Sequence, residues 1–143
     1  MIAFSHNSTI NGGKGNDLIA NDGGTGDDTL SGGADNDKLL GGAGNDCIRG
    51  GTGRDLLWGD DGKDNFYYAK GDGKDVIFGF ENGDTLTFDN ITFKTSMASY
   101  DKSAGTLTIN VSSGSVTLKD FTTSTFHINN DTYKISGTTL KKQ

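Results

Sequence analysis

GGAGNDCIR at residues 41–49 is followed directly by GGTGRDLLW at residues 50–58, so one nine-residue pattern occurs twice in succession. Each copy has glycine at positions one, two and four, aspartate at position six and an apolar side chain at position eight. Position six is Asp46 and Asp55, and position eight is Ile48 and Leu57. Self-similarity at a fixed period is the signature of repeat proteins, so this stretch predicts a solenoid.

The pattern extends in both directions over residues 12–87, with its copies starting at residues 12, 23, 32, 41, 50, 59, 70 and 79. The spacing is nine residues except at two-residue insertions, Asn21–Asp22 and Tyr68–Ala69. A degenerate copy at residues 3–11 has Ser8 where aspartate is expected. Position six of the eight copies is Asp17, Asp28, Asp37, Asp46, Asp55, Asp64, Asp75 and Asp84. Position eight is Ile19, Leu30, Leu39, Ile48, Leu57, Phe66, Ile77 and Leu86.

Composition and charge limit the classes of function. The chain is only 31% hydrophobic, below the ~45–50% usual for globular domains. Such a composition with excess negative charge indicates either disorder or a fold to which another species, such as a metal, supplies the missing energy. Residues 12–84 hold 15 acidic and 7 basic side chains, a net charge of −8, and residues 85–143 hold 4 and 6, a net charge of +2. The acidic half argues against a nucleic-acid partner. No run of about 18 apolar residues occurs, so no membrane span is expected.

The repeat resembles the RTX repeat, the GGxGxDxUx nonapeptide of secreted bacterial toxins, proteases, lipases and alginate epimerases. The resemblance covers residues 12–87 and implies an all-β fold, a right-handed parallel β-roll in which two nonapeptides form one coil. It also implies Ca²⁺ as cofactor, with each ion held between turns n and n+2 on the same edge. A type I-secreted, extracellular bacterial protein is implied, with this chain as part of a larger polypeptide.

The residue types suit calcium. Glycines at positions one, two and four permit left-handed and other backbone conformations that turn carbonyl groups inward. Carbonyl and carboxylate oxygens are the hard ligands that calcium prefers, six to eight of them. Cysteine and histidine, which softer metals prefer, are absent from these positions. Positions seven to nine are expected to form a short strand whose middle side chain points inward.

Candidate ligands fall on two edges of the predicted roll. The turns that start at residues 12, 32, 50 and 70 form the first edge, and those at 23, 41, 59 and 79 form the second. Three gaps on each edge allow six sites, and we expect four to six ions. Candidates on the first edge are Gly12, Lys14, Asp17, Gly32, Gly33, Ala34, Asp35, Asp37, Gly50, Gly51, Thr52, Gly53, Asp55, Gly71, Gly73 and Asp75. Candidates on the second edge are Gly23, Thr25, Asp28, Gly41, Gly42, Ala43, Gly44, Asp46, Gly59, Asp60, Asp61, Gly62, Asp64 and Asp84.

Three copies carry a cation at position five, where most others carry Asn or Asp: Arg54, Lys63 and Lys74. If these side chains pointed at the ions, they would weaken the sites near the C-terminal end of the roll.

The second half of the chain has a different pattern. From Phe88 the glycine period stops and apolar residues alternate, which predicts hairpins over residues 107–118 and 126–135. We therefore divide the chain into a calcium-binding roll, residues 1–87, and an antiparallel β-rich cap, residues 88–143. A cap is expected because the last coil of a solenoid would otherwise expose its core.

The sequence raises three candidate functions. The first is calcium binding that drives folding and stabilises a toxin, adhesin or exoenzyme module, with no catalysis, because no nucleophile elbow or paired glutamates occur. The second is a substrate- or polysaccharide-binding helper of a secreted lipase, protease or epimerase, with Trp58 and residues 66–68 as a sugar platform or as packing residues. The third, an adhesin or ice-binding repeat, needs regular outward rows, which position three lacks. A polysaccharide or cell surface is the candidate partner.

Overall fold

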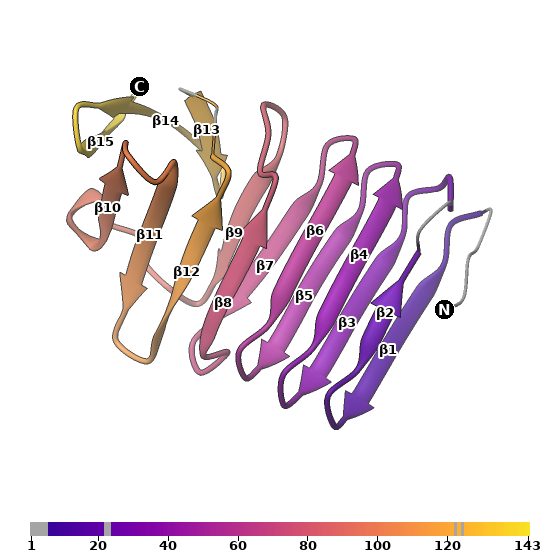
Figure 1. The fold of residues 1–143 in the computed structure, drawn as a ribbon. Coiled ribbons are helices and arrows are strands. Elements are labelled where there is room, and N and C mark those ends of the chain that lie inside the picture. Colours follow the sequence, from indigo (N-terminus) through magenta and orange to yellow (C-terminus); the bar gives the residue numbers. More distant parts are fainter. Residues whose placement is uncertain (1–5, 22–23, 122, 124) are drawn as a thin grey trace.

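The computed structural model describes residues 6–21, 24–121, 123 and 125–143, and it contains two sheets that face each other (Figure 1). Sheet A has the strand order β1-β3-β5-β7-β9-β13-β14-β15. Its bounds are β1 Thr9–Lys14, β3 Thr29–Ala34, β5 Cys47–Thr52, β7 Asn65–Ala69, β9 Thr85–Asp89, β13 Thr125–Ile128, β14 Asp131–Ser136 and β15 Thr139–Lys142.

Sheet B has the order β10-β11-β12-β8-β6-β4-β2. Its bounds are β2 Leu18–Ala20, β4 Lys38–Ala43, β6 Leu56–Asp61, β8 Lys74–Phe78, β10 Ala98–Asp101, β11 Thr106–Val111 and β12 Gly114–Lys119. A short 3-10 helix, η1, spans Thr95–Met97. No helix within the described residues is long and apolar enough to cross a membrane.

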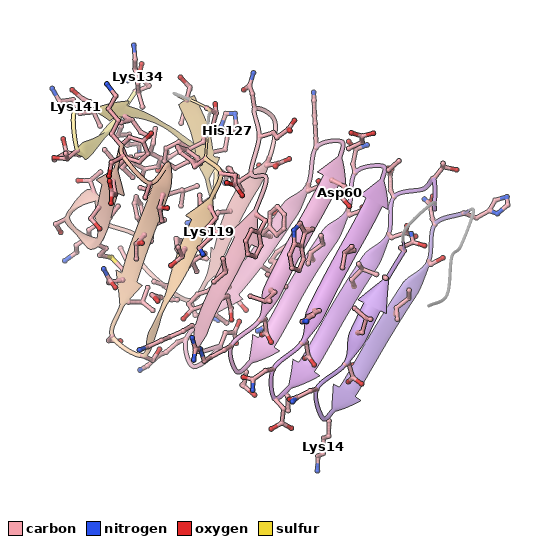
Figure 2. The ribbon with its side chains drawn as sticks, in the orientation of Figure 1. Lys14, Asp60, Lys119, His127, Lys134 and Lys141 are labelled. Carbon is pink, nitrogen blue, oxygen red and sulfur yellow. The ribbon has the colours of Figure 1, made fainter. Side chains whose placement is uncertain are left out.

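The predicted parallel β-roll is confirmed. Successive repeats place their strands alternately in sheet A and sheet B, so two nonapeptides complete one coil. Equivalent residues of every second repeat pair in parallel, as Leu30 does with Ile48 and Ile48 with Phe66. The turns therefore group into the two predicted edges, and Lys14 and Asp60 lie at opposite edges of the roll (Figure 2).

The strands are longer than the three residues expected. β3, β4, β5 and β6 are each six residues long and continue through positions one to three of the next repeat. Gly33 pairs with Gly51 within this extension. The absence of side chains at positions one and two lets neighbouring coils stay close, so the ladder runs on into the turn.

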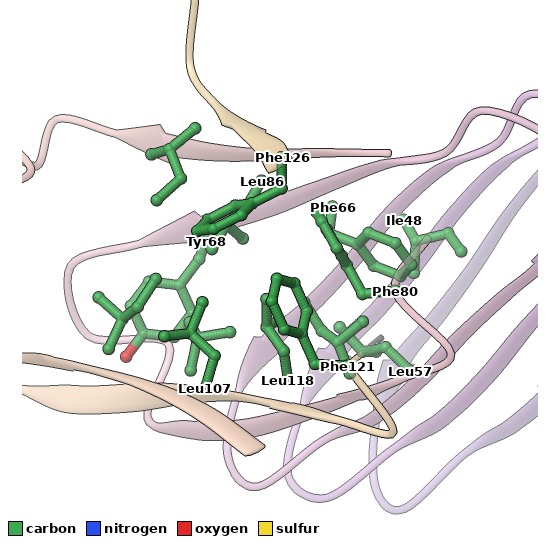
Figure 3. Close-up of a cluster of buried hydrophobic side chains, with 14 of the residues drawn as sticks. Ile48, Leu57, Phe66, Tyr68, Phe80, Leu86, Leu107, Leu118, Phe121 and Phe126 are labelled. Atoms are coloured by element: carbon green, nitrogen blue, oxygen red, sulfur yellow. The ribbon is translucent and has the colours of Figure 1, made fainter. Parts of the chain in front are cut away.

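The core of the roll is one apolar side chain deep per strand. Position eight is buried in all eight copies, from Leu39 at 0% exposed to Ile19 at 7%. Tyr68 and Phe80 add two large rings toward the C-terminal end (Figure 3). Burial of so few side chains, at roughly 1.5–3 kcal/mol each, leaves the roll dependent on other sources of stability.

The cap extends both sheets. The two predicted hairpins are confirmed as β11 with β12 and β13 with β14, and each gains a strand that we did not predict, β10 and β15. β12 pairs in parallel with β8, and β13 pairs in parallel with β9. Phe80 of the roll contacts the rings of Phe121 and Phe126 (Figure 3). The apolar core therefore runs without a break from the roll into the cap.

The aromatic residues that were candidates for a sugar platform are placed in two ways. Phe66 and Tyr68 are buried, so packing explains them. Trp58 lies half-buried on sheet B and stacks on Phe78, with centroids 4.6 Å apart and planes 5° apart. The Lys119 amino group lies 5.8 Å from the Phe78 centroid. The stacking covers one face of each ring and so reduces the flat surface that is open to a sugar ring.

Candidate metal sites

The position-six aspartates form one column along each edge. On the first edge, the amide of Asp17 donates to Asp37 Oδ1 at 2.7 Å, and the amide of Asp37 donates to Asp55 Oδ1 at 2.8 Å. On the second edge, the amide of Asp46 donates to Asp64 Oδ1 at 2.9 Å. The columns end in the same way at Asp75 and Asp84. In every position-six aspartate after Asp17, one carboxylate oxygen thus accepts a hydrogen bond from the preceding coil of its own edge.

The second carboxylate oxygen behaves differently. In five aspartates Oδ2 is buried and has no hydrogen-bond partner among the described residues: Asp17, Asp37, Asp46, Asp55 and Asp64. A buried anionic oxygen without a donor costs several kcal/mol. A bound cation is the partner that removes this cost without adding a hydrogen-bond donor to the fold.

Carbonyl oxygens converge on the same places. A Cβ atom built on Gly32 would collide with Asp37 Oδ2 and lie 2.6 Å from the Gly50 carbonyl oxygen. A Cβ on Gly12 would collide with Asp17 Oδ2 and lie 2.7 Å from the Gly32 carbonyl oxygen. We call the space beside such a position-one glycine a cradle. Each cradle contains a carboxylate oxygen of one coil and faces a glycine carbonyl oxygen of the next coil. The same relation occurs at Gly41, Gly50 and Gly59 against the aspartate of their own copy.

Most position-one glycines do not adopt the left-handed backbone, which is one of the conformations expected of them. Gly12, Gly32 and Gly41 do not have positive φ, so the left-handed backbone does not explain them. They are needed because a side chain would fill the cradle. Positive φ occurs at most glycines of positions two and four, for example 116° at Gly33 and 147° at Gly53, and also at Gly79, the position-one glycine of the last copy, with φ 65°.

Within the described part of the repeats, two non-glycine residues take the same left-handed conformation, Asp35 with φ 80° and Asp60 with φ 68°. Asp35 also accepts a hydrogen bond from the Gly15 amide at 3.1 Å. These two departures from the repeat therefore keep the shape of the turn.

Positions three and five join coils rather than face the cradles. The carbonyl oxygens of Ala43, Asp61 and Asp72 accept from the amides of the adjacent coil. Asn16, Asn36, Asn45 and Asp27 form a second, exposed ladder in which a side-chain oxygen accepts the next position-five amide.

The cations Arg54, Lys63 and Lys74 are exposed, while the aspartates that follow them are buried. Their side chains therefore lie at the surface rather than among the unpartnered oxygens.

Burial and crowding raise the pKa of the column. Loss of solvation is the largest cause, and neighbouring aspartates add to it. It raises the pKa of Asp64 to about 7 and the pKa of Asp75 to about 8. The pKa values of Asp37, Asp46 and Asp55 are raised for the same reasons. Ionising these carboxyl groups in the calcium-free fold is therefore less favourable than ionising them in water.

The remaining candidates are less uniform. Gly23 lies outside the described residues. Lys14, Thr25 and Thr52 are exposed, and a Cβ on Gly71 would meet no atom within 4 Å. Asp84 has both oxygens satisfied, by the amides of Asp64 at 2.9 Å and Glu81 at 2.8 Å. Among the described residues, no three His, Cys, Asp or Glu side chains gather as a metal cluster. The candidate sites instead bring together one carboxylate oxygen and backbone carbonyl oxygens.

Two polar residues that bear on these sites were not predicted from the sequence. Asn21 is fully buried and donates its side-chain amide to Asp28 Oδ2. Asp72 is 5% exposed, accepts from the Ala69 amide at 2.7 Å and lies 3.8 Å from the Arg49 guanidinium. Both belong to or adjoin the two insertions, whose irregular spacing was the only signal in the sequence.

Comparison with protein families gives the decisive match. The model of the RTX calcium-binding nonapeptide repeat matches residues 3–20, 22–46 and 46–73, in four copies. These are RTX repeats. RTX repeats bind calcium within a parallel β-roll, in agreement with the cradles described above. A comparison with curated proteins gave no match.

Proposed function

We propose that this chain is a calcium-loaded folding module in which each ion joins two successive coils on one edge of the roll. The observation that carries the proposal is the set of five buried, unpartnered Oδ2 atoms, each beside a position-one glycine that leaves room for a ligand. Asp17, Asp37 and Asp55 would hold ions on the first edge. Asp46 and Asp64 would hold them on the second, with glycine carbonyls of the adjoining coils completing the shell.

Calcium is favoured over other cations by the donor set. All converging atoms are carboxylate or carbonyl oxygens, which calcium accepts in numbers of six to eight. Zinc favours a tetrahedral set of nitrogen and sulfur side-chain ligands, and among the described residues no three His, Cys, Asp or Glu side chains gather. Magnesium needs a small octahedral shell and sheds water reluctantly, so it fits a cradle of backbone carbonyls poorly.

We further infer that the module acts outside a bacterial cell, as part of a larger secreted polypeptide. RTX repeats are typical of such proteins. A roll whose stability depends on calcium would stay unfolded where calcium is scarce and fold where it is abundant. Calcium would then act both as ligand and as the signal that export is complete.

The test is a calcium titration followed by far-ultraviolet circular dichroism. We expect a coil-like spectrum in excess chelator at pH 8, a β spectrum in millimolar calcium, and reversal on adding chelator. Magnesium at the same concentration should give little change. A fully folded spectrum in excess chelator at that pH, or equal folding with magnesium, would contradict the proposal.

A further inference from the structure

We propose that one of the six gaps of the roll, the gap between the turns at residues 23 and 41, holds no ion. The side-chain amide of Asn21 occupies the place that the ion would take. This inference rests on the proposed calcium function. It assigns five ions to the molecule, three on the first edge and two on the second. It also gives the two-residue insertion at Asn21 a role, which is to exclude an ion from this gap.

The Asp28 carboxylate provides the main evidence. Its Oδ1 accepts a hydrogen bond from the Ser8 amide at 2.6 Å, and its Oδ2 accepts one from the side-chain amide of Asn21. Asp28 is only 2% exposed, so its position in the interior matches that of Asp46 and Asp64 on the same edge. Those two aspartates each keep one buried oxygen without a partner, whereas Asp28 keeps none.

The backbone holds Asn21 firmly in this position. The Asn21 amide donates to the Leu40 carbonyl at 3.0 Å, and the Asn21 carbonyl accepts from the Gly24 amide at 2.8 Å. A Cβ on Gly42 would lie 2.6 Å from that same carbonyl oxygen, so the next coil packs directly against it. The side chain is fully buried. Asn21 is therefore part of the stack of turns rather than a surface loop.

An amide group and a calcium ion exclude each other at this oxygen. The NH₂ group is a hydrogen-bond donor, and calcium binds only acceptor atoms. While Asn21 donates to Asp28 Oδ2, its N–H points into the space that an ion would need. The neutral amide removes the cost of the buried oxygen, as an ion would, but adds no charge and needs no calcium.

The amide can take the place of the ion because the two-residue insertion changes the spacing between the first two copies. A regular copy runs straight from position nine into position one, as Leu40 does into Gly41. The first copy is followed instead by an inserted pair, and its first member reaches the carboxylate seven residues later. The second insertion, after Tyr67, does not place an amide in a cradle, and Asp64 and Asp55 beside it keep unpartnered oxygens.

Native mass spectrometry of the folded, calcium-saturated chain tests the inference by counting bound ions. The wild type should hold five. Asn21→Ala empties the place of the amide and leaves Asp28 Oδ2 without a partner, so it should hold six. Asn21→Asp replaces the donor by an acceptor and should also hold six, which gives a second result if the alanine variant does not fold.

Asn45→Ala is the matched control. It removes an asparagine from the same edge, but Asn45 is exposed and its oxygen accepts from the Lys63 amide outside the cradles. It should keep five ions. Six ions on the wild type, or five on Asn21→Asp, would overturn the inference while leaving calcium binding intact. A wild type that binds no calcium would instead reject the proposed function itself.

Discussion

At the scale of single residues, the position-one glycines show that a missing side chain can be part of a binding site. Gly32 has an ordinary φ, yet a Cβ there would meet Asp37 Oδ2 and the carbonyl of Gly50. The carbonyl and the carboxylate can approach a common ligand only because nothing stands between them. Glycine can recur at a position for two reasons: the backbone needs a positive φ, or a side chain would fill a space that is needed. The sequence pattern does not show which of the two applies.

The first prediction separates the two reasons. Gly32→Ala should remove one calcium ion from the folded protein, because the methyl group fills a cradle. It should also raise the calcium midpoint, which is the calcium concentration at which half of the protein is folded. Gly15→Ala is the control: Gly15 has φ 103°, and a Cβ there would meet nothing within 4 Å. It should lose about 1–2 kcal/mol of stability from backbone strain and keep the same number of ions. Equal ion counts for both variants would contradict the cradle.

A second prediction compares two aspartates by their place in the column. Asp46 accepts from the Asp28 amide with one oxygen and leaves the other for the next gap, so it serves both neighbouring coils. Asp17 begins its edge and has no earlier repeat aspartate to serve. Asp46→Ala should therefore raise the calcium midpoint more than Asp17→Ala does, as measured by dichroism. Equal shifts would show that the coils do not share these carboxylates.

At the scale of elements, the regular repeat made the strands of the roll and their partners predictable. The alternation of apolar residues also predicted β11 to β14. β10 and β15 could not be predicted, because β10 contains no buried residue and β15 contains only Leu140. Their place is set by pairing with a neighbouring strand rather than by their own pattern.

The candidate sites were predictable to a similar degree. The phase of the aspartates gave both columns and both edges. The side-chain direction of Asn21 could not be predicted, since an insertion appears in a sequence only as a break in spacing.

Each carboxylate column leads to a prediction about pH. Asp64 and Asp75 have pKa values of about 7 and about 8 in the fold, against about 3.9 for an unperturbed aspartate. Between those limits the calcium-free fold binds protons that the unfolded chain releases, so its stability falls as pH rises through that window. In calcium-free solution, the β signal should grow as pH falls from 8 to 5.

Asp64→Asn and Asp75→Asn check the origin of that effect. An amide cannot ionise, so each variant should show a weaker dependence of the calcium-free β signal on pH. At pH 8, the wild type should recover its β signal on adding calcium. A calcium-free signal that does not change between pH 5 and pH 8 would show that the columns do not limit the fold.

At the scale of the whole molecule, roll and cap share one core. β8 and β9 end the roll, and β12 and β13 continue their sheets. Half of the buried hydrophobic side chains among the described residues come from residues 88–143. The last coil is therefore covered on its open side in the same way as the inner coils are covered by their neighbours.

Truncation after Thr87 tests this dependence. All eight position-six aspartates remain, so a model based on local ligands alone predicts no change. We expect instead that residues 1–87 need far more calcium to fold than the full chain does, because the edges of β8 and β9 and the ring of Phe80 become exposed. Calcium titration of both proteins side by side measures the difference. An unchanged midpoint would make the second half an independent appendage.

In inner aspartates such as Asp37 and Asp46, the two carboxylate oxygens differ in their partners, and this difference has a consequence for the shape of the binding curve. One oxygen holds the coil before it, and the other is left for the gap after it, so an ion that orders one turn also positions a ligand of the next. Binding of the first ion already fixes that ligand, so binding of the second ion has a smaller entropic cost. Binding should therefore be cooperative along each edge, with a Hill coefficient well above one. A module of this kind responds to a threshold of calcium rather than in proportion to it.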